Sequence, residues 1–176
     1  MVKKVYCDRK ARVFHVICAF FTYFDYFEPY FYPLHFLQGD VQVINENILV
    51  GPYPHYDEIE RLKKKFGVTV IISLLNADLP QEKALLKREE KMAQKIGITV
   101  YNYPLEYFHV NSEHNQKTID QLTVFIKNLR NDKVYIHCYL GKNRVEKVKS
   151  KLKFPCFTGT YIFGASVRFG LIALRR

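Results

Sequence analysis

The fold is decided by residues 134–145, which read Val-Tyr-Ile-His-Cys-Tyr-Leu-Gly-Lys-Asn-Arg-Val. The stretch begins with a short apolar run of the kind that forms a buried strand in an α/β sheet. Cys138 follows this run closely, Gly141 lies in the middle of the next five residues, and Arg144 comes directly after them. The lysines and valines beyond Arg144 are compatible with the start of a helix. The stretch therefore predicts a strand, a tight loop and a helix N-terminus.

A strand, a loop and a helix N-terminus in this order form a site for an anion. Successive backbone N–H groups converge on one point there, and the helix dipole adds about half a positive charge. The same groups favour the thiolate form of Cys138, and the guanidinium of Arg144 matches two oxygens of a phosphate. We therefore expect a cysteine nucleophile aimed at phosphorus. A buried cysteine beside a surface arginine is the alternative, but it does not explain Gly141 or the abrupt polarity change at Lys142.

The motif His-Cys-x5-Arg after a strand resembles the signature of the cysteine-dependent tyrosine and dual-specificity phosphatases. Residues 48–75, ILVGPYPHYDEIERLKKKFGVTVIISLL, also resemble the opening strand, helix and second strand of that family. The resemblance covers residues 48–144. It implies a phosphomonoester hydrolase that forms a cysteinyl-phosphate on phosphotyrosine, phosphoserine or phosphothreonine proteins, with no metal and no cofactor.

The resemblance also implies roles for the residues of the motif. Cys138 is expected to attack phosphorus, and His137 to orient the loop by hydrogen bonding. The phosphate is expected to contact Tyr139, Leu140, Gly141, Lys142, Asn143 and Arg144. Val145 stands where the family usually carries Ser or Thr, whose hydroxyl hydrogen-bonds the thiolate, so we expect slow release of the thiolate. A phosphate-binding module with little turnover and a phosphoinositide lipid phosphatase stay open as alternatives.

The leaving group needs a proton donor. In the family this is an aspartate on a mobile loop that follows a strand and precedes the cysteine. The corresponding loop here is 103–109, in which Glu106 lies 32 positions ahead of Cys138 and is the nearby carboxylate. Glu106 is therefore the expected acid, with His109, Glu113 and Asp78 as alternatives.

The rest of the chain alternates between two hydrophobic periods. Strands are predicted near residues 41–50, 68–75 and 98–103, and helices over 56–66, 80–96 and 112–130. This alternation predicts an α/β fold like that of the dual-specificity phosphatases, with a mainly parallel central sheet flanked by helices. A ligand is then expected at the carboxyl ends of the strands, where Cys138 lies. The predicted catalytic domain spans 41–154, and residues 155–176 form a divergent C-terminal tail.

Residues 1–40 form a basic, aromatic-rich extension. The net charge of the chain is +10, with +4 in residues 1–12, +8 in 141–176 and −2 between them. Basic ends favour anionic partners, although solubilising charge explains them equally well. The uncharged run 13–24 is too short for a membrane span of about 20 residues. An anchor at an anionic membrane surface and an extension packed on the domain both fit residues 1–40.

The remaining composition bounds the class of protein. A chain that is 48% hydrophobic and 25% charged is typical of a globular protein. The four cysteines, Cys7, Cys18, Cys138 and Cys156, form no C-x-x-C pair, so a disulfide framework is not expected. A thiolate enzyme needs a reducing compartment, which predicts a cytoplasmic location, with membrane association as an option. The expected partner is a phosphorylated protein or phospholipid substrate, and no nucleic-acid motif is present.

Overall fold

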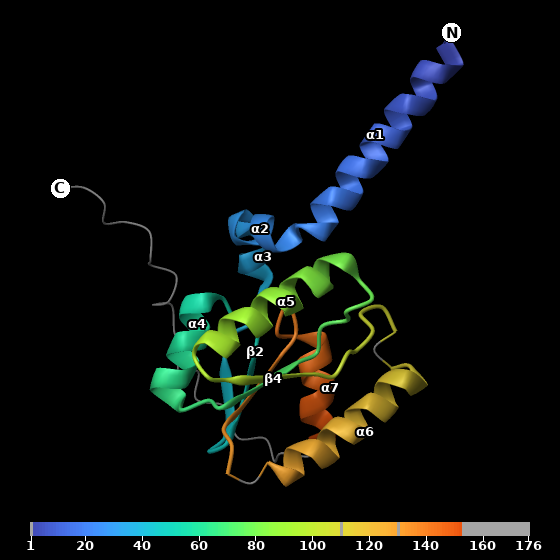
Figure 1. Ribbon diagram of the computed structural model, residues 1–176. Coiled ribbons are helices and arrows are strands. Elements are labelled where there is room, and N and C mark those ends of the chain that lie inside the picture. Colours follow the sequence, from blue (N-terminus) through green and yellow to red (C-terminus); the bar gives the residue numbers. More distant parts are fainter. Residues whose placement is uncertain (1, 110, 130, 153–176) are drawn as a thin grey trace, which may run out of the picture.

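The computed structural model describes residues 2–109, 111–129 and 131–152. Helices cover both faces of a central five-stranded sheet, and the N-terminal helix α1 (Val2–Thr22) projects away from the sheet and its helices (Figure 1). The predicted α/β fold is confirmed. The predicted tail, residues 155–176, lies outside the described residues.

The sheet has the strand order β1-β2-β5-β3-β4. These strands are β1 (Gln42–Asn45), β2 (Ile48–Gly51), β5 (Val134–His137), β3 (Val70–Ser73) and β4 (Thr99–Asn102). Only the pair β1 and β2 is antiparallel. Gly51, Ser73 and His137 are level in the register, so the chain leaves three parallel strands at one edge of the sheet. The residue after β5 is Cys138, which places it at this edge as predicted.

Two layers of helices bury the two faces of the sheet. The helices are α4 (Tyr56–Arg61) with its continuation η2 (Leu62–Phe66), α5 (Pro80–Lys95), α6 (Glu113–Asn128) and α7 (Asn143–Leu152). The face covered by α6 and α7 buries Val50, Ile72, Leu122, Ile136 and Val148. The face covered by α4, η2 and α5 buries Leu49, Ile59, Ile71, Met92 and Tyr135. Successive residues of β5 thus enter opposite layers, as the alternation of a strand requires.

Local signals in the sequence placed most helix ends correctly. Gly67 and Gly97 adopt positive φ angles of 72° and 69° and end η2 and α5 as predicted. Ser112 caps α6 by accepting a hydrogen bond from the backbone N–H of Asn115. The end of α6 was predicted two residues too late, because the helix stops at Asn128.

Residues 24–39 pack on the domain, and α1 comes close to α5 and packs Phe20 on the rings of this segment. This segment holds α2 (Phe24–Phe27), η1 (Glu28–Tyr30) and α3 (Tyr32–Leu37). The ring of Phe24 packs against the buried cluster of Tyr53, Leu75, Leu85 and Leu86. The guanidinium of Arg88 on α5 donates a hydrogen bond to the carbonyl of Asp25. The packed-extension interpretation therefore holds for residues 24–39.

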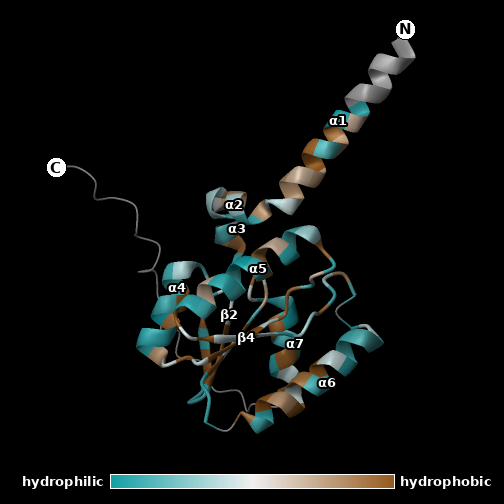
Figure 2. Ribbon diagram, in the orientation of Figure 1, coloured by the Kyte–Doolittle hydropathy of each residue, from teal (hydrophilic) through white to brown (hydrophobic). Residues whose placement is uncertain are grey.

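Helix α1 presents apolar side chains to solvent instead. Figure 2 shows hydrophobic residues along its described part. Phe14 and Val16 are 66% and 68% exposed. Within the described residues, no helix combines the length and the hydropathy that a membrane crossing requires.

Candidate active site

The predicted strand, loop and helix are present around Cys138. Strand β5 is buried along its whole length, and Cys138 directly after it is 3% exposed. The chain then bends through residues 139–142 into α7, which starts at Asn143. Cys138 therefore lies below the N-terminus of a ten-residue helix.

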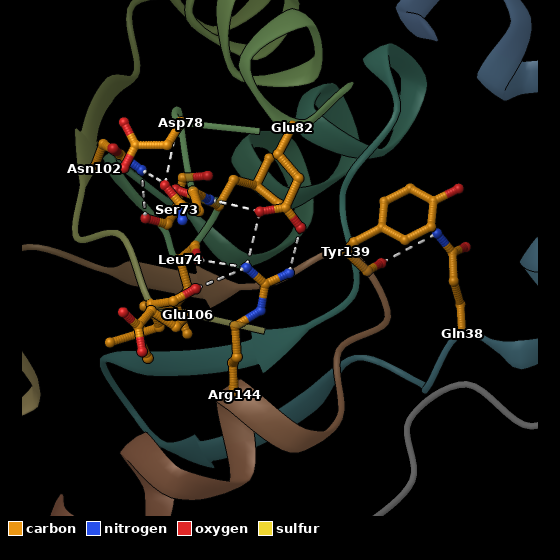
Figure 3. Close-up of polar contacts among 12 residues, drawn as sticks. Gln38, Ser73, Leu74, Asp78, Glu82, Asn102, Glu106, Tyr139 and Arg144 are labelled. Atoms are coloured by element: carbon orange, nitrogen blue, oxygen red, sulfur yellow. Dashed lines mark hydrogen bonds and ion pairs between the residues drawn. The ribbon is translucent and has the colours of Figure 1, made fainter. Parts of the chain in front are cut away.

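Neighbouring segments hold the outer side of the loop after Cys138. The carbonyl of Tyr139 accepts hydrogen bonds from the backbone N–H of Tyr53 at 3.2 Å and from the side-chain amide of Gln38 at 3.3 Å (Figure 3). The carbonyl of Leu140 accepts one from the N–H of Gly39 at 2.8 Å. Two consecutive carbonyls of the loop thus point outward.

Outward carbonyls leave the following N–H groups on the inner side. All described peptide bonds are trans, and in a trans peptide the N–H points opposite to the carbonyl that precedes it. The N–H groups of Leu140 and Gly141 therefore point away from the outer neighbours. The carbonyl of Lys142 points along α7 and accepts a hydrogen bond from the N–H of Glu146 in the first turn. The N–H of Asn143 therefore points the opposite way, beyond the N-terminus of the helix. Binding of an anion by these N–H groups is the role that the sequence analysis predicts for them.

Gly141 is required by the close contact between the loop and β2. Its φ angle is +67°, in the region that residues with a Cβ rarely adopt. A Cβ at this position would overlap the backbone of Gly51 and Pro52. The loop can therefore lie this close to the end of β2 only with glycine at position 141.

Arg144 is buried and hydrogen-bonded to three segments. Only 2% of its surface is exposed. Its Nη1 donates to the carbonyls of Leu74 at 2.9 Å and Leu105 at 3.2 Å (Figure 3). Glu82 on α5 forms a two-pronged ion pair with it, with Oε2 3.0 Å from Nη1 and Oε1 2.6 Å from Nη2. The guanidinium is therefore fixed in orientation.

These contacts use one edge of the guanidinium. The Nε–H and the second hydrogen of Nη2 lie on the other edge, which keeps the two-pronged geometry that matches a phosphate. Burial alone would lower the pKa of Arg144, but the carboxylate of Glu82 and, to a smaller extent, Cys138 raise it above its ordinary value. Arg144 is therefore a permanent buried cation beside Cys138.

Glu82 is a site residue that the sequence analysis missed. It lies in the first turn of α5, where an acidic residue is ordinarily explained by the helix dipole. Its Oε2 also accepts the backbone N–H of Asn76 at 2.6 Å. Nothing in the sequence near Glu82 or Arg144 shows that the two side chains meet.

His137 does not contact the loop as expected. Its Nε2 lies 2.6 Å from Oε1 of Glu89 on α5, and both side chains are fully buried. Within the described part of the chain, its Nδ1 has no hydrogen-bond partner. The hydrogen bond that orients His137 therefore ties β5 to α5.

The loop that carries Glu106 lies against Arg144. Asn115 is fully buried; its Oδ1 accepts the N–H of Glu106 at 2.8 Å, and its Nδ2 donates to the carbonyls of Glu106 and His109. On either side of Glu106, Leu105 accepts a hydrogen bond from Arg144 and the Tyr107 ring lies 5.5 Å from the guanidinium carbon. The structure thus holds the backbone of Glu106 between two residues that contact Arg144, and its side chain is partly exposed (Figure 3).

The alternative acids are more exposed than Glu106. His109, Glu113 and Asp78 are all exposed.

Val145 is 1% exposed and belongs to the core cluster that also contains Cys138. A core side chain therefore occupies the position at which the family usually carries a hydroxyl.

We predict that Gly141→Ala lowers stability more than Gly67→Ala does. Both positions have φ near +70°, which costs about 1–2 kcal/mol for a residue with a Cβ. At position 67 the nearest atom to a new Cβ belongs to the flexible side chain of Lys133, whereas position 141 adds an overlap with backbone. Urea unfolding measures the difference, and equal losses for the two variants would show that the loop does not press on β2.

We predict that Glu82→Gln lowers the free energy of unfolding by about 3–5 kcal/mol, because it leaves the buried Arg144 without an opposite charge. Glu90→Gln on the same helix is the control, since Glu90 is exposed and should cost less than about 0.5 kcal/mol. Urea unfolding monitored by circular dichroism tests this. Similar losses in both variants would contradict the importance of the ion pair.

Comparison with known proteins finds solved structures whose fold is similar to that of this chain. No family model and no curated protein matches the sequence. Among solved structures, a putative phosphatase (DUF442) from Shewanella putrefaciens CN-32 is 18% identical with a TM-score of 0.53, over 64% of this chain and 68% of that chain. The core catalytic domain of the PP-IP phosphatase SIW14 from S. cerevisiae is 16% identical with a TM-score of 0.52. There the match covers 63% of each chain, less than two thirds.

A third structure, Tk-PTP in its active form, is 18% identical with a TM-score of 0.51, over 64% of this chain and 71% of that chain. At these identities the likeness establishes the fold. The chain therefore has the fold of the protein tyrosine and dual-specificity phosphatases that its His-Cys-x5-Arg motif resembles.

Proposed function

We propose that the protein is a cysteine-dependent phosphomonoester hydrolase. The observation that carries the proposal is the position of Cys138, at the start of the loop that leads into α7 and beside the buried cation of Arg144. Such an arrangement stabilises the negative charge of a phosphoryl group in the transition state. The fold shared with known phosphatases supports it.

The proposed reaction has two steps. The sulfur of Cys138 attacks phosphorus, an S–P bond forms, and the P–O bond to the leaving group breaks while Glu106 gives a proton to the departing oxygen. Water then attacks the cysteinyl-phosphate, which releases inorganic phosphate and the thiolate. The loop N–H groups from Leu140 to Arg144 and the Nε edge of the guanidinium bind the phosphoryl oxygens. Val145 offers no hydroxyl to the departing thiolate, so the second step is the slow one.

The proposed substrates are phosphorylated tyrosine, serine or threonine side chains of proteins. Tyr107, whose ring lies against the guanidinium of Arg144, is 42% exposed, and Phe108, which packs on Tyr107, is 86% exposed. Such a surface suits the aromatic and apolar groups of a peptide. Lys142 in the loop is exposed and would equally suit a phosphoinositide headgroup. Because the fold is similar to that of the PP-IP phosphatase SIW14, a PP-IP substrate should be assayed beside phosphopeptides and phosphoinositides.

We predict that Cys138→Ser lowers the turnover of p-nitrophenyl phosphate by a factor of about 10⁴ or more, because serine is not ionised at neutral pH. Vanadate should still bind to the variant through the loop and Arg144. The control is Cys18→Ser, since Cys18 is an exposed cysteine on α1 and its loss should not change turnover. Turnover by Cys138→Ser at the parental rate would contradict the mechanism.

The same assay separates an enzyme from a binding module. Vanadate binding to the parent protein, with no turnover of phosphopeptides, phosphoinositides or PP-IP substrates, would replace the proposed hydrolase by a phosphate-binding module. Turnover of one class only would assign the substrate.

We also propose that residues 1–37 bind an anionic membrane surface. Their sequence places Lys3, Lys4, Arg9, Lys10 and Arg12 before an aromatic-rich stretch. Apolar side chains of α1 are exposed, as are the rings of Tyr26 and Tyr30 at 70% and 75%. Basic residues beside exposed aromatic residues suit the interface between lipid headgroups and acyl chains.

We predict that the full-length protein sediments with phosphatidylserine-containing vesicles at low salt and is partly released at high salt. The double variant Phe14→Glu with Val16→Glu should sediment at least about tenfold less, because it removes apolar surface and adds negative charge. Val124→Glu is the control, since Val124 is 60% exposed on α6 in the catalytic domain. Equal sedimentation of all forms would refute binding through α1.

A further inference from the structure

Three potential metal ligands meet where the N-terminal segment contacts the domain. They are Glu28 on η1, His35 on α3 and His55 at the start of α4, and their ligand atoms all lie within 4.8 Å of one another. Nε2 of His35 lies 3.2 Å from Oε1 of Glu28, and Nδ1 of His55 lies 3.6 Å from Oε2 of Glu28. None of these residues takes part in the proposed phosphatase chemistry.

The burial of Glu28 is unusual for a carboxylate. Glu28 is 0% exposed. Within the described part of the chain, Oε2 of Glu28 and Nε2 of His55 are buried and form no hydrogen bond. A buried polar atom without a partner costs free energy, and the cost is larger for a charged group. The His55 nitrogen that faces Oε2 of Glu28 is Nδ1, at 3.6 Å. A cation held between Nδ1 and Oε2 would therefore supply the partner that Oε2 of Glu28 lacks.

The kind of donor indicates the kind of cation. Two imidazoles and one carboxylate match zinc sites, in which three protein ligands leave one position open. In a tetrahedral site with metal–ligand bonds of about 2.0–2.1 Å, ligand atoms lie about 3.3 Å apart. Each imidazole lies at about that separation from a different oxygen of Glu28: His35 is 3.2 Å from Oε1, to which it is hydrogen-bonded, and His55 is 3.6 Å from Oε2. Mg²⁺ and Ca²⁺ prefer oxygen ligands and fit this set poorly.

We propose that Glu28, His35 and His55 bind a transition-metal cation of the zinc class. The cation would be structural, because it would join η1 and α3 of the N-terminal segment to His55, the N-cap residue of α4.

The proposed metal site is linked to the loop that follows Cys138. The hydroxyl of Tyr139 lies 3.3 Å from Oε1 of Glu28 and donates a hydrogen bond to it. Burial, and next the charge of Glu28, raise the pKa of Tyr139, so this hydroxyl keeps its proton and acts as the donor. A cation on Glu28 would therefore fix the ring of Tyr139 together with residues 24–39, which hold the outer side of the loop.

The test uses the untagged full-length Cys138→Ser protein, so that the nucleophilic thiolate does not bind metal and no turnover is involved. After equilibrium dialysis against Zn²⁺, we expect about one zinc per chain by elemental analysis. Co²⁺ should give the intense visible absorption of a tetrahedral site, and Mg²⁺ should not compete. Zn²⁺ should also raise the melting temperature, because it binds the folded state.

Matched variants locate the site. Glu28→Gln keeps the shape of the side chain, and His35→Gln changes a side chain that is 27% exposed and should fold normally. Each should weaken zinc binding by about tenfold or more and abolish the zinc-dependent rise in melting temperature. His15→Gln, on exposed α1, is the control and should bind like the parent. Absence of stoichiometric zinc, or equal binding by all four proteins, would overturn the proposal and leave the proposed hydrolase untouched.

Discussion

The buried ion pair between Arg144 and Glu82 is the interaction on which the rest of the site depends. A guanidinium that is 2% exposed needs an opposite charge and carbonyl acceptors, and it finds them in α5 and in the segments after β3 and β4. These segments are separate in the sequence, so satisfying one cation fixes their positions relative to the loop after Cys138. The same bonds fix the orientation of the other edge of the guanidinium, formed by Nε–H and the second hydrogen of Nη2, which can bind an anion.

Helix α5 and the N-terminal segment together support the loop from outside. Helix α5 presents Glu82 to Arg144 and, two turns later, Glu89 to His137. Residues 38 and 39 then cover the loop, and a Cβ on Gly39 would lie 3.1 Å from the carbonyl oxygen of Gly141. The predicted extension, residues 1–40, is therefore divided, because residues 24–39 pack on the domain and α1 projects away from it (Figure 1).

Most of the fold could be predicted from the sequence because its signals are local. The apolar run before Cys138, the positive-φ glycines Gly67 and Gly97, and the cap at Ser112 each depend on residues a few positions apart. The candidate site could be predicted only in part. The spacing of Cys138 and Arg144 follows from one loop, whereas the expected hydrogen bond from His137 to the loop was wrong, since its partner is 48 residues away.

The sequence by itself determined the order of strands and helices and the loop between Cys138 and Arg144, because short-range sterics and hydrophobic period fix these features. The need for glycine at position 141 comes from the tertiary structure, since a Cβ there would overlap the backbone of Gly51 and Pro52. Only the tertiary structure decided which charges meet. Glu82 and Arg144 are 62 residues apart, and Glu28 reaches His55 and Tyr139 from an N-terminal segment that could equally have stayed free. A buried charge takes whichever partner packing brings within reach, and packing is a property of the whole chain.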